Sequence, residues 1–173
     1  MLRGRQEKFS VNVWAGIIGR HLIGSYILPD RLNAHNYLVF LREVLPELLE
    51  EVPIGVRQNM WLQQDGAPAH GAIMIRNYPN QIYPQRWMGR FGPLPWPARS
   101  PDLNPLDFFF WGAMKELVNS TPVIDEQDLI ARIAAAALLI KEKPDVFDNV
   151  REAMTRRCNA CIQANAGNFE HIL

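Results

Sequence analysis

Alternating apolar and polar residues near the beginning of the chain predict a β-hairpin. Residues 9–18 (FSVNVWAGII) are rich in β-branched and aromatic side chains with a period of two, which is typical of a strand. A turn at 19–21 is followed by a second apolar run at 22–28, and Pro29 ends that run. We therefore expect two antiparallel strands at the start of the fold.

The apolar spacing then becomes helical. Asn33 is a suitable N-cap for a helix that runs to about Glu51, and Pro53 and Gly55 end this segment. One face of the helix is apolar, because leucines recur at spacings of three and four: Leu38, Leu41, Leu45, Leu48 and Leu49. This face is expected to pack against the hydrophobic core.

The middle of the chain is less regular. A short apolar strand is expected at 59–64, directly before Asp65, and a short helix at 71–78. Residues 79–107 are rich in Pro, Gly, Trp and Arg, so little regular structure is expected there except a short strand near 94–96. A loop of this length in a compact domain is usually functional or wrongly assigned.

Helical spacing returns in the last third of the chain. Helices are predicted at 106–118, 125–141 and 145–164, with Pro122 and Pro144 separating them. Strands first, a mixed middle and helices last indicate an α/β domain with a helical C-terminal part.

Length and composition indicate one folded domain without a membrane partner. The chain has 173 residues, of which 48% are hydrophobic and five are tryptophan. No run approaches the roughly 20 apolar residues of a membrane span, and residues 1–10 lack the apolar core of a secretory signal. Cys158 and Cys161 are too few for a disulfide framework, and a single CxxC lacks two further ligands for structural zinc.

The charge distribution is more informative than the net charge of zero, which argues against a strongly basic nucleic-acid binder. Between residues 54 and 101 the only acidic residue is Asp65, among five arginines: Arg57, Arg76, Arg86, Arg90 and Arg99. Surface scatter explains this pattern as well as phosphate binding does. Arg86, Arg90 and Arg99 are candidates for contacts with a DNA backbone, and Trp87 and Trp96 for base stacking. A solvated loop with tryptophans in the core is the alternative.

Asp65 and Asp107 are the candidate catalytic carboxylates. Asp65 follows an apolar strand, at the end where open α/β sheets place their sites, although an Asp before Gly is also a common turn element. Asp107 begins an apolar helix after two prolines, and a charge favoured by the helix dipole is its structural explanation. Asp102 competes with it in the same segment, but an Asp in a Ser-Pro-Asp turn more often caps backbone donors.

Carboxylates of this kind suit a hard divalent cation. Mg²⁺ takes oxygen ligands and keeps several waters, and paired ions can hold the attacking and leaving oxygens of a phosphodiester. Asp65 and Asp107 in a locally basic stretch fit that chemistry in part. The residues alone lead to metal-dependent phosphoryl chemistry and no further.

Two long motifs add a resemblance. WLQQDGAPAH at 61–70, followed by WPARSPDLNPLDFFFWG at 96–112, resembles the paired signature of mariner-type DNA transposases. VNVWAGI at 11–17 resembles a strand of their catalytic domain, and CNACIQANAGNFEHIL at 158–173 resembles how many of them end. The resemblance therefore extends over nearly the whole chain.

This resemblance implies a ribonuclease-H-like fold with three acidic residues that bind two Mg²⁺ (or Mn²⁺) ions. Such enzymes nick transposon ends and join the freed 3′-hydroxyl to target DNA in the nucleus, and a homodimer is a further expectation. Asp65 matches the second acid and Asp107 the third. The third acid is Asp and not Glu, which resembles the mariner branch of the transposase superfamily. His70 lies in the first motif and is a candidate for DNA contact, with a structural role as the alternative.

The chain also departs from the family pattern. The first acid should lie on a strand before VNVWAGI, where this chain has only residues 1–8 and no Asp, and whether Met1 is the true start stays open. We therefore expect a partial ribonuclease-H-like domain at 1–120, truncated at its N-terminal strand, with a helical extension at 121–173 packed on it. Metal binding should be weakened and the chain inactive alone. The alternatives are a non-catalytic DNA-binding or interaction remnant, or a relic without function.

Overall fold

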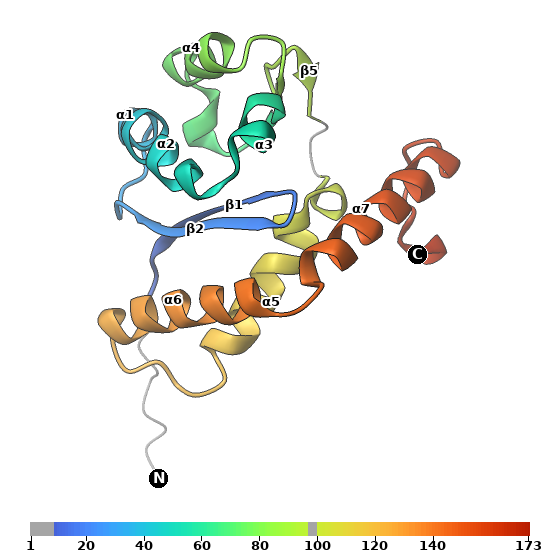
Figure 1. Ribbon diagram of the computed structural model, residues 1–173. Coiled ribbons are helices and arrows are strands. Elements are labelled where there is room, and N and C mark those ends of the chain that lie inside the picture. Colours follow the sequence, from blue (N-terminus) through green and yellow to red (C-terminus); the bar gives the residue numbers. More distant parts are fainter. Residues whose placement is uncertain (1–8, 97–99) are drawn as a thin grey trace.

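The computed structural model describes residues 9–96 and 100–173 (Figure 1). The strands are β1 (Asn12–Ile18), β2 (His21–Leu28), β3 (Leu62–Gln63), β4 (Trp87–Gly89) and β5 (Leu94–Pro95). The α-helices are α1 (Ala34–Val39), α2 (Leu45–Leu48), α3 (Ile54–Asn59), α4 (Ile73–Ile82), α5 (Trp111–Val118), α6 (Glu126–Glu142) and α7 (Val146–Gln163). Segments with π-helical hydrogen bonding precede α2 at Phe40–Val44 and α5 at Leu106–Phe110, and short 3-10 turns lie at Leu49–Glu51, Pro68–Gly71, Pro101–Leu103 and Glu170–Ile172.

The predicted hairpin is present. β1 and β2 pair antiparallel from Asn12 opposite Leu28 to Ile18 opposite His21, with a bulge between Trp14 and Ala15. Gly24, which pairs with Ala15 at this irregularity, has φ +83°, and a Cβ atom on it would stand 3.0 Å from the carbonyl oxygen of Trp14. Only glycine accommodates both the backbone conformation and this close approach.

The other strands form a separate parallel sheet in the order β3-β4-β5. Within the described residues, β1 is hydrogen-bonded only to β2 and β3 only to β4, so no strand pairing joins the two sheets. β1 and β3 thus each carry one edge without a partner strand in this part of the chain. Unpaired edges of this kind are places where another extended chain can add.

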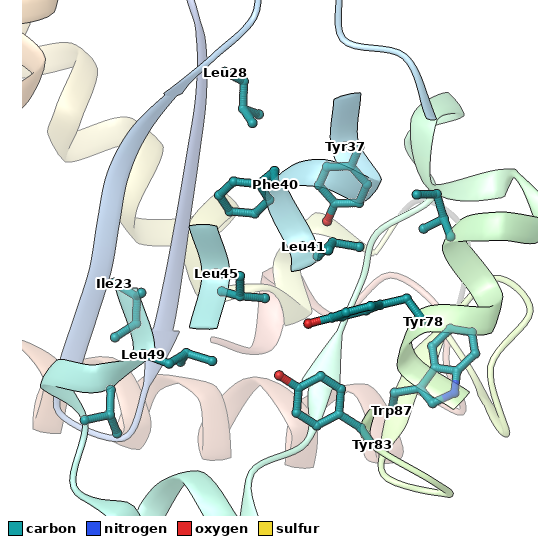
Figure 2. Packing of buried hydrophobic residues seen from close by; sticks show 12 residues of the cluster. Ile23, Leu28, Tyr37, Phe40, Leu41, Leu45, Leu49, Tyr78, Tyr83 and Trp87 are labelled. Carbon is teal, nitrogen blue, oxygen red and sulfur yellow. The ribbon is translucent and has the colours of Figure 1, made fainter. Parts of the chain in front are cut away.

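A helix joins the two sheets instead. The segment from α1 to Glu51 is one helical run, and the predicted N-cap is confirmed, because the Asn33 side chain accepts a hydrogen bond of 2.9 Å from the backbone N–H of Asn36. Its apolar face lies between the hairpin and the second sheet (Figure 2). This first core consists of Ile23, Leu28, Tyr37, Phe40, Leu41, Leu45, Leu49, Val52, Ile75, Tyr78, Tyr83 and Trp87.

The opposite face of the hairpin carries a second core. Helices α5 and α6 cover this face, and α7 extends away from them towards the C-terminal end of the chain (Figure 1). Ala15 and Leu22 from the hairpin pack here with Phe110, which is completely buried, and with Ile133 and other residues of α6. Among the described residues no helix is both long and apolar enough to cross a membrane.

Two elements differ from the predictions. The first helical run ends at Glu51 before Pro53, as predicted, but residues 54–59 form α3, for which no helix was predicted, and Pro53 is its N-cap. Residues 87–89 form β4 inside the segment predicted to be irregular. A three-residue strand has no detectable period, and Trp87 becomes part of the sheet because its ring fills the first core.

Replacement of Phe110 by alanine should destabilise the fold. Its side chain has no exposed surface, so the cavity and the lost burial should cost about 3–5 kcal/mol in the free energy of unfolding. Leu139→Ala is the matched control, because Leu139 lies on a neighbouring helix and is 58% exposed. Urea denaturation measures both variants. Equal losses of stability in the two variants would contradict the assignment of Phe110 to the core.

Candidate active site

Asp65 lies at the carboxyl end of β3, where the chain leaves the sheet. The preceding residue, Gln64, is only 5% exposed and its backbone N–H donates to Met88 on β4 at 2.9 Å. The Asp65 Oδ1 atom accepts a hydrogen bond from the backbone N–H of Ala67 at 3.0 Å and lies 2.8 Å from Nδ1 of His70. The turn interpretation is confirmed, because Oδ1 accepts the hydrogen bond that fixes the turn. Oδ2 has no hydrogen-bond partner among the described residues, and its role as a metal ligand stays a prediction.

A row of contacts connects Asp65 to the first core. The His70 ring stacks on Tyr37 from α1 at 4.4 Å between centroids, and the Gln64 amide donates to the Tyr37 hydroxyl at 3.5 Å. Burial, followed by the nearby charge of Asp65, raises the pKa of Tyr37 far above its ordinary value, so its hydroxyl stays neutral. His70 is therefore held both by the core and by the carboxylate, and its position in the site is fixed from two sides.

Asp107 is oriented by its own motif. The Asn104 side-chain amide donates to Oδ2 of Asp107 at 2.8 Å, while the Asn104 Oδ1 accepts from the backbone N–H of Leu106 at 3.2 Å. Asp107 sits in the first turn of the helical segment that leads into α5. The rigid proline-flanked turn thus fixes both the backbone and the carboxylate of this residue.

Asp102, the competing acid, faces a different element. Its Oδ1 lies 4.0 Å from Nη1 of Arg157 on α7, and its carbonyl oxygen accepts from the same nitrogen at 3.4 Å. The Arg157 guanidinium also lies 4.5 Å from the centre of the Phe108 ring. Asp102 therefore contributes to the attachment of α7, which is consistent with the choice of Asp107 as the candidate ligand.

The two candidate carboxylates interact electrostatically. The hydrogen bond from His70 is the main cause that lowers the pKa of Asp65, with burial opposing it and the Ala67 N–H supporting it. Burial raises the pKa of Asp107, the hydrogen bond from Asn104 opposes this, and the charge of Asp65 raises it further. Forty-one residues separate Asp65 and Asp107 in the sequence, yet the fold brings them close enough for one charge to affect the other.

The donor type fits a hard divalent cation, but the number of donors is low. A cation between Asp65 and Asp107 would remove the repulsion that raises the pKa of Asp107, and carboxylate oxygens are its preferred ligands. In the part of the chain that the structure describes, no group of three or more His, Cys, Asp or Glu side chains is arranged to hold a metal. Cys158 and Cys161 are half-buried free thiols in α7.

The predicted DNA-contacting residues are found in different settings. His70 lies at the site itself, and Arg90 is exposed beside it. The Arg86 guanidinium donates to the carbonyl oxygens of Gln58 and Met60, so in this structure it joins α3 to the second sheet. Arg99 lies outside the described residues. DNA contact by each of these residues stays a prediction.

The tryptophans of the predicted stacking pair also differ. Trp87 is 2% exposed and its indole N–H donates to Asn80 at 2.9 Å, so it belongs to the core, as the alternative interpretation of this loop had it. Trp96 is half-buried.

Sequence reasoning missed two residues at the site. A small pocket of about 60 Å³ next to Asp65 is lined by Arg76 from α4 and by Phe91 from the loop after β4, together with His70 and Arg90. The arginine-rich character of residues 54–101 was the only signal for Arg76. Phe91 had none, because an aromatic residue in a Gly- and Pro-rich loop has no periodic pattern around it.

Comparisons with known proteins place this geometry in a context. No protein-family model matches the chain. The chain is 28% identical over 109 residues to the transposable element Tc3 transposase of Caenorhabditis elegans, a match that covers 63% of this chain and only 30% of that protein. The chain thus spans about a third of the length of the curated relative it matches.

Solved structures show the same fold. The catalytic domain of Mos1 mariner transposase superposes with a TM-score of 0.69 at 18% identity, covering 92% of this chain and 82% of that chain. The same domain with raltegravir and Mg gives a TM-score of 0.67 at 20% identity, covering 86% and 72%. The Mos1 paired-end complex with the left transposon end gives 0.65 at 21% identity, covering 88% and 42%.

The fold is therefore an α/β, ribonuclease-H-like one, as predicted from the motifs. The resemblance to mariner-type transposases is also confirmed: the chain has the fold of a mariner transposase catalytic domain, and its sequence is similar to that of the Tc3 transposase. The division at residue 120 and the roles of the individual site residues stay predictions.

Removal of the Asp65 charge should lower the pKa of Asp107. The negative charge of Asp65 disfavours ionisation of Asp107, so Asp65→Asn should shift the midpoint of the Asp107 titration to lower pH. NMR titration of the carboxyl carbons measures this shift. Asp102→Asn is the control and should leave the midpoint in place, because Asp102 faces Arg157. An unchanged midpoint in Asp65→Asn would show that the two carboxylates are not neighbours.

Removal of His70 should raise the pKa of Asp65. Because His70 stabilises the ionised carboxylate, His70→Ala should raise the pKa of Asp65. The folded-state pKa of Asp65 lies below its ordinary value of 3.8, so this pair stabilises the wild-type fold above that value. The contribution is lost as the pH falls through the folded-state pKa. Urea denaturation of both proteins between pH 6 and about pH 2 should therefore show a smaller acid-induced loss of stability for His70→Ala.

Proposed function

We propose that this chain is part of a DNA transposase catalytic domain, which cleaves and joins DNA strands with the help of divalent metal ions. The observation that carries the proposal is the fold that this chain shares with the Mos1 catalytic domain. Within this chain, Asp65 directly follows β3, and Asn104 holds the carboxylate of Asp107. The two motifs that resemble the mariner-type signature contain these two residues. DNA is the expected partner. We also expect the protein to form a homodimer and to act in the nucleus.

The relatives support the choice of metal and partner. Mos1 catalytic-domain structures contain Mg or Mn, and further Mos1 structures hold a transposon end in a paired-end complex. For this chain we propose Mg²⁺ or Mn²⁺ at Asp65 and Asp107. When bound there, the metal would activate the attacking oxygen and neutralise charge that develops on the phosphodiester.

The chain's own residues supply orientation. Asn104 holds the Asp107 carboxylate through Oδ2, and His70 with the Ala67 N–H holds the Asp65 carboxylate through Oδ1. Ligand oxygens that are fixed before the metal arrives lose less entropy on binding. Arg90 is exposed and lines the pocket, which supports the proposal that it attracts the phosphate backbone.

We further propose that the isolated chain is a weak catalyst or an inactive one. The resemblance implies three acids, and the described residues contain no group of three metal-binding side chains. This same observation favours the second candidate function, a DNA-binding or interaction module without catalysis. Loss of one carboxylate from a two-metal site should weaken the binding of both ions.

Metal binding and nicking together test the proposal. Calorimetric titration with Mn²⁺ should show binding to the wild-type chain that is lost in Asp65→Asn and in Asp107→Asn. Asn104→Ala should weaken the affinity by about 10–100-fold, because Asn104 orients the ligand. Asp102→Asn is the matched control and should bind as the wild type does.

Nicking of supercoiled DNA in the presence of Mn²⁺ separates the two candidate functions. Nicking that disappears in Asp65→Asn and Asp107→Asn supports the enzyme. Metal binding without nicking supports the non-catalytic module, provided that the chain still binds DNA. Mn²⁺ binding that is identical in all variants would remove the basis for assigning a metal site to Asp65 and Asp107.

A further inference from the structure

An exposed aromatic ring stands beside the candidate active site. Phe91 is 46% exposed and lies in a tight turn in which the backbone N–H of Gly92 donates to the carbonyl oxygen of Gly89 at 3.2 Å. The backbone N–H of Trp96 donates to the same oxygen at 3.0 Å. Two hydrogen bonds to one carbonyl oxygen therefore hold the turn, and the side chain of Phe91 on this turn is exposed.

The turn rests on the buried ring of Trp87. A Cβ atom on Gly92 would stand 3.0 Å from this ring and 3.1 Å from the Gly89 nitrogen, so a side chain would push the turn off its support. Trp87 is itself held in the core by the hydrogen bond to Asn80. Phe91 is thus an exposed ring on a rigid support.

Two arginines flank the ring. The Arg76 guanidinium carbon lies 3.6 Å from the centre of Phe91, and its Nε and Nη2 atoms donate to the carbonyl oxygen of Gly71 at 3.1 and 2.9 Å. Arg90 is farther away, at 5.2 Å, and is exposed. In the described part of the chain Arg90 makes no ion pair and no hydrogen bond through its side chain. One cation is therefore fixed against Phe91 and the other is available to a ligand.

The group lies next to Asp65. Phe91, Arg76 and Arg90 line the same small pocket as Asp65 and His70. A flat apolar ring with adjacent positive charge matches the chemistry of single-stranded nucleic acid, in which bases stack on aromatic rings and phosphates pair with arginine.

We propose that Phe91 is a stacking platform for one unpaired base of a DNA strand held next to Asp65, with Arg90 contacting the adjacent phosphate. Arg76 lies against one face of the ring. The inference rests on the proposed function, since the strand to be cleaved has to approach Asp65. It adds that the nucleotides at this place are unpaired, because a base within a duplex has no free face to offer.

The test is binding of a fluorescently labelled single-stranded oligonucleotide in EDTA, so that no metal contributes. Phe91→Leu keeps an apolar side chain but removes the flat ring, and the dissociation constant should rise at least about fivefold. Phe91→Tyr should bind as the wild type does. Trp61→Leu is the matched control, because Trp61 is equally exposed at 48% but does not line the pocket, and it should not alter binding.

A 2-aminopurine base in the oligonucleotide reports stacking directly. Its fluorescence should be quenched by the wild type and by Phe91→Tyr, and not by Phe91→Leu, with circular dichroism confirming that each variant is folded. Arg90→Gln should keep the quenching and reduce the salt dependence of binding by about one unit in the log–log slope. Unaltered affinity and quenching in Phe91→Leu, or no binding of the single strand by the wild type, would overturn the inference.

The result is separable from that of the proposed function. Phe91-dependent quenching in EDTA together with absent Mn²⁺ binding would support the stacking platform and contradict the metal site. Mn²⁺ binding that depends on Asp65, with no effect of Phe91→Leu on binding of the single strand, would support the metal site and contradict the stacking platform. An equal loss of affinity for a fully paired duplex in Phe91→Leu would count against recognition of an unpaired base.

Discussion

The packing of one helical run between two unconnected sheets is the constraint on which this structure depends. No strand pairing joins the hairpin to β3-β4-β5 in the described residues, so the apolar face from Tyr37 to Leu49 is what holds them together (Figure 2). Hydrophobic burial has no direction of its own, but interlocked side chains fix relative positions as firmly as hydrogen bonds do. Tyr37 extends this packing to the site, since it stacks on the histidine that holds Asp65.

The two carboxylates of the candidate site have pKa values shifted in opposite directions. Asp65 is stabilised as an anion by His70 and a backbone N–H, whereas Asp107 is destabilised as an anion by burial and by Asp65. A pair of carboxylates that repel each other is unfavourable for folding and favourable for binding a cation, because the cation removes the repulsion. This opposition between folding and cation binding is the physical basis for proposing a metal at the pair.

Neighbouring acids in one motif serve different ends. Asp102 and Asp107 are five residues apart, yet Asp102 faces Arg157 on α7 while Asp107 faces Asn104 and the site. Two nearby arginines also have different roles. Arg86 donates to backbone carbonyl oxygens, whereas Arg90, four residues later, is exposed at the pocket. Residue type and local charge density could not distinguish the members of either pair, because the distinction lies in which element each side chain meets.

The sequence by itself determined the hairpin, the long leucine-faced helix with its Asn33 cap, and the C-terminal helices, because each depends on a local period. Only the tertiary structure decided that α3 and β4 exist, that Trp87 is core, and that Arg76 and Phe91 stand beside Asp65. Short elements have too few residues to show a period, and their conformation follows from the surfaces they cover. A site assembled from β3, α4 and the loop after β4 becomes visible only when the chain is folded, since no spacing in the sequence records that proximity.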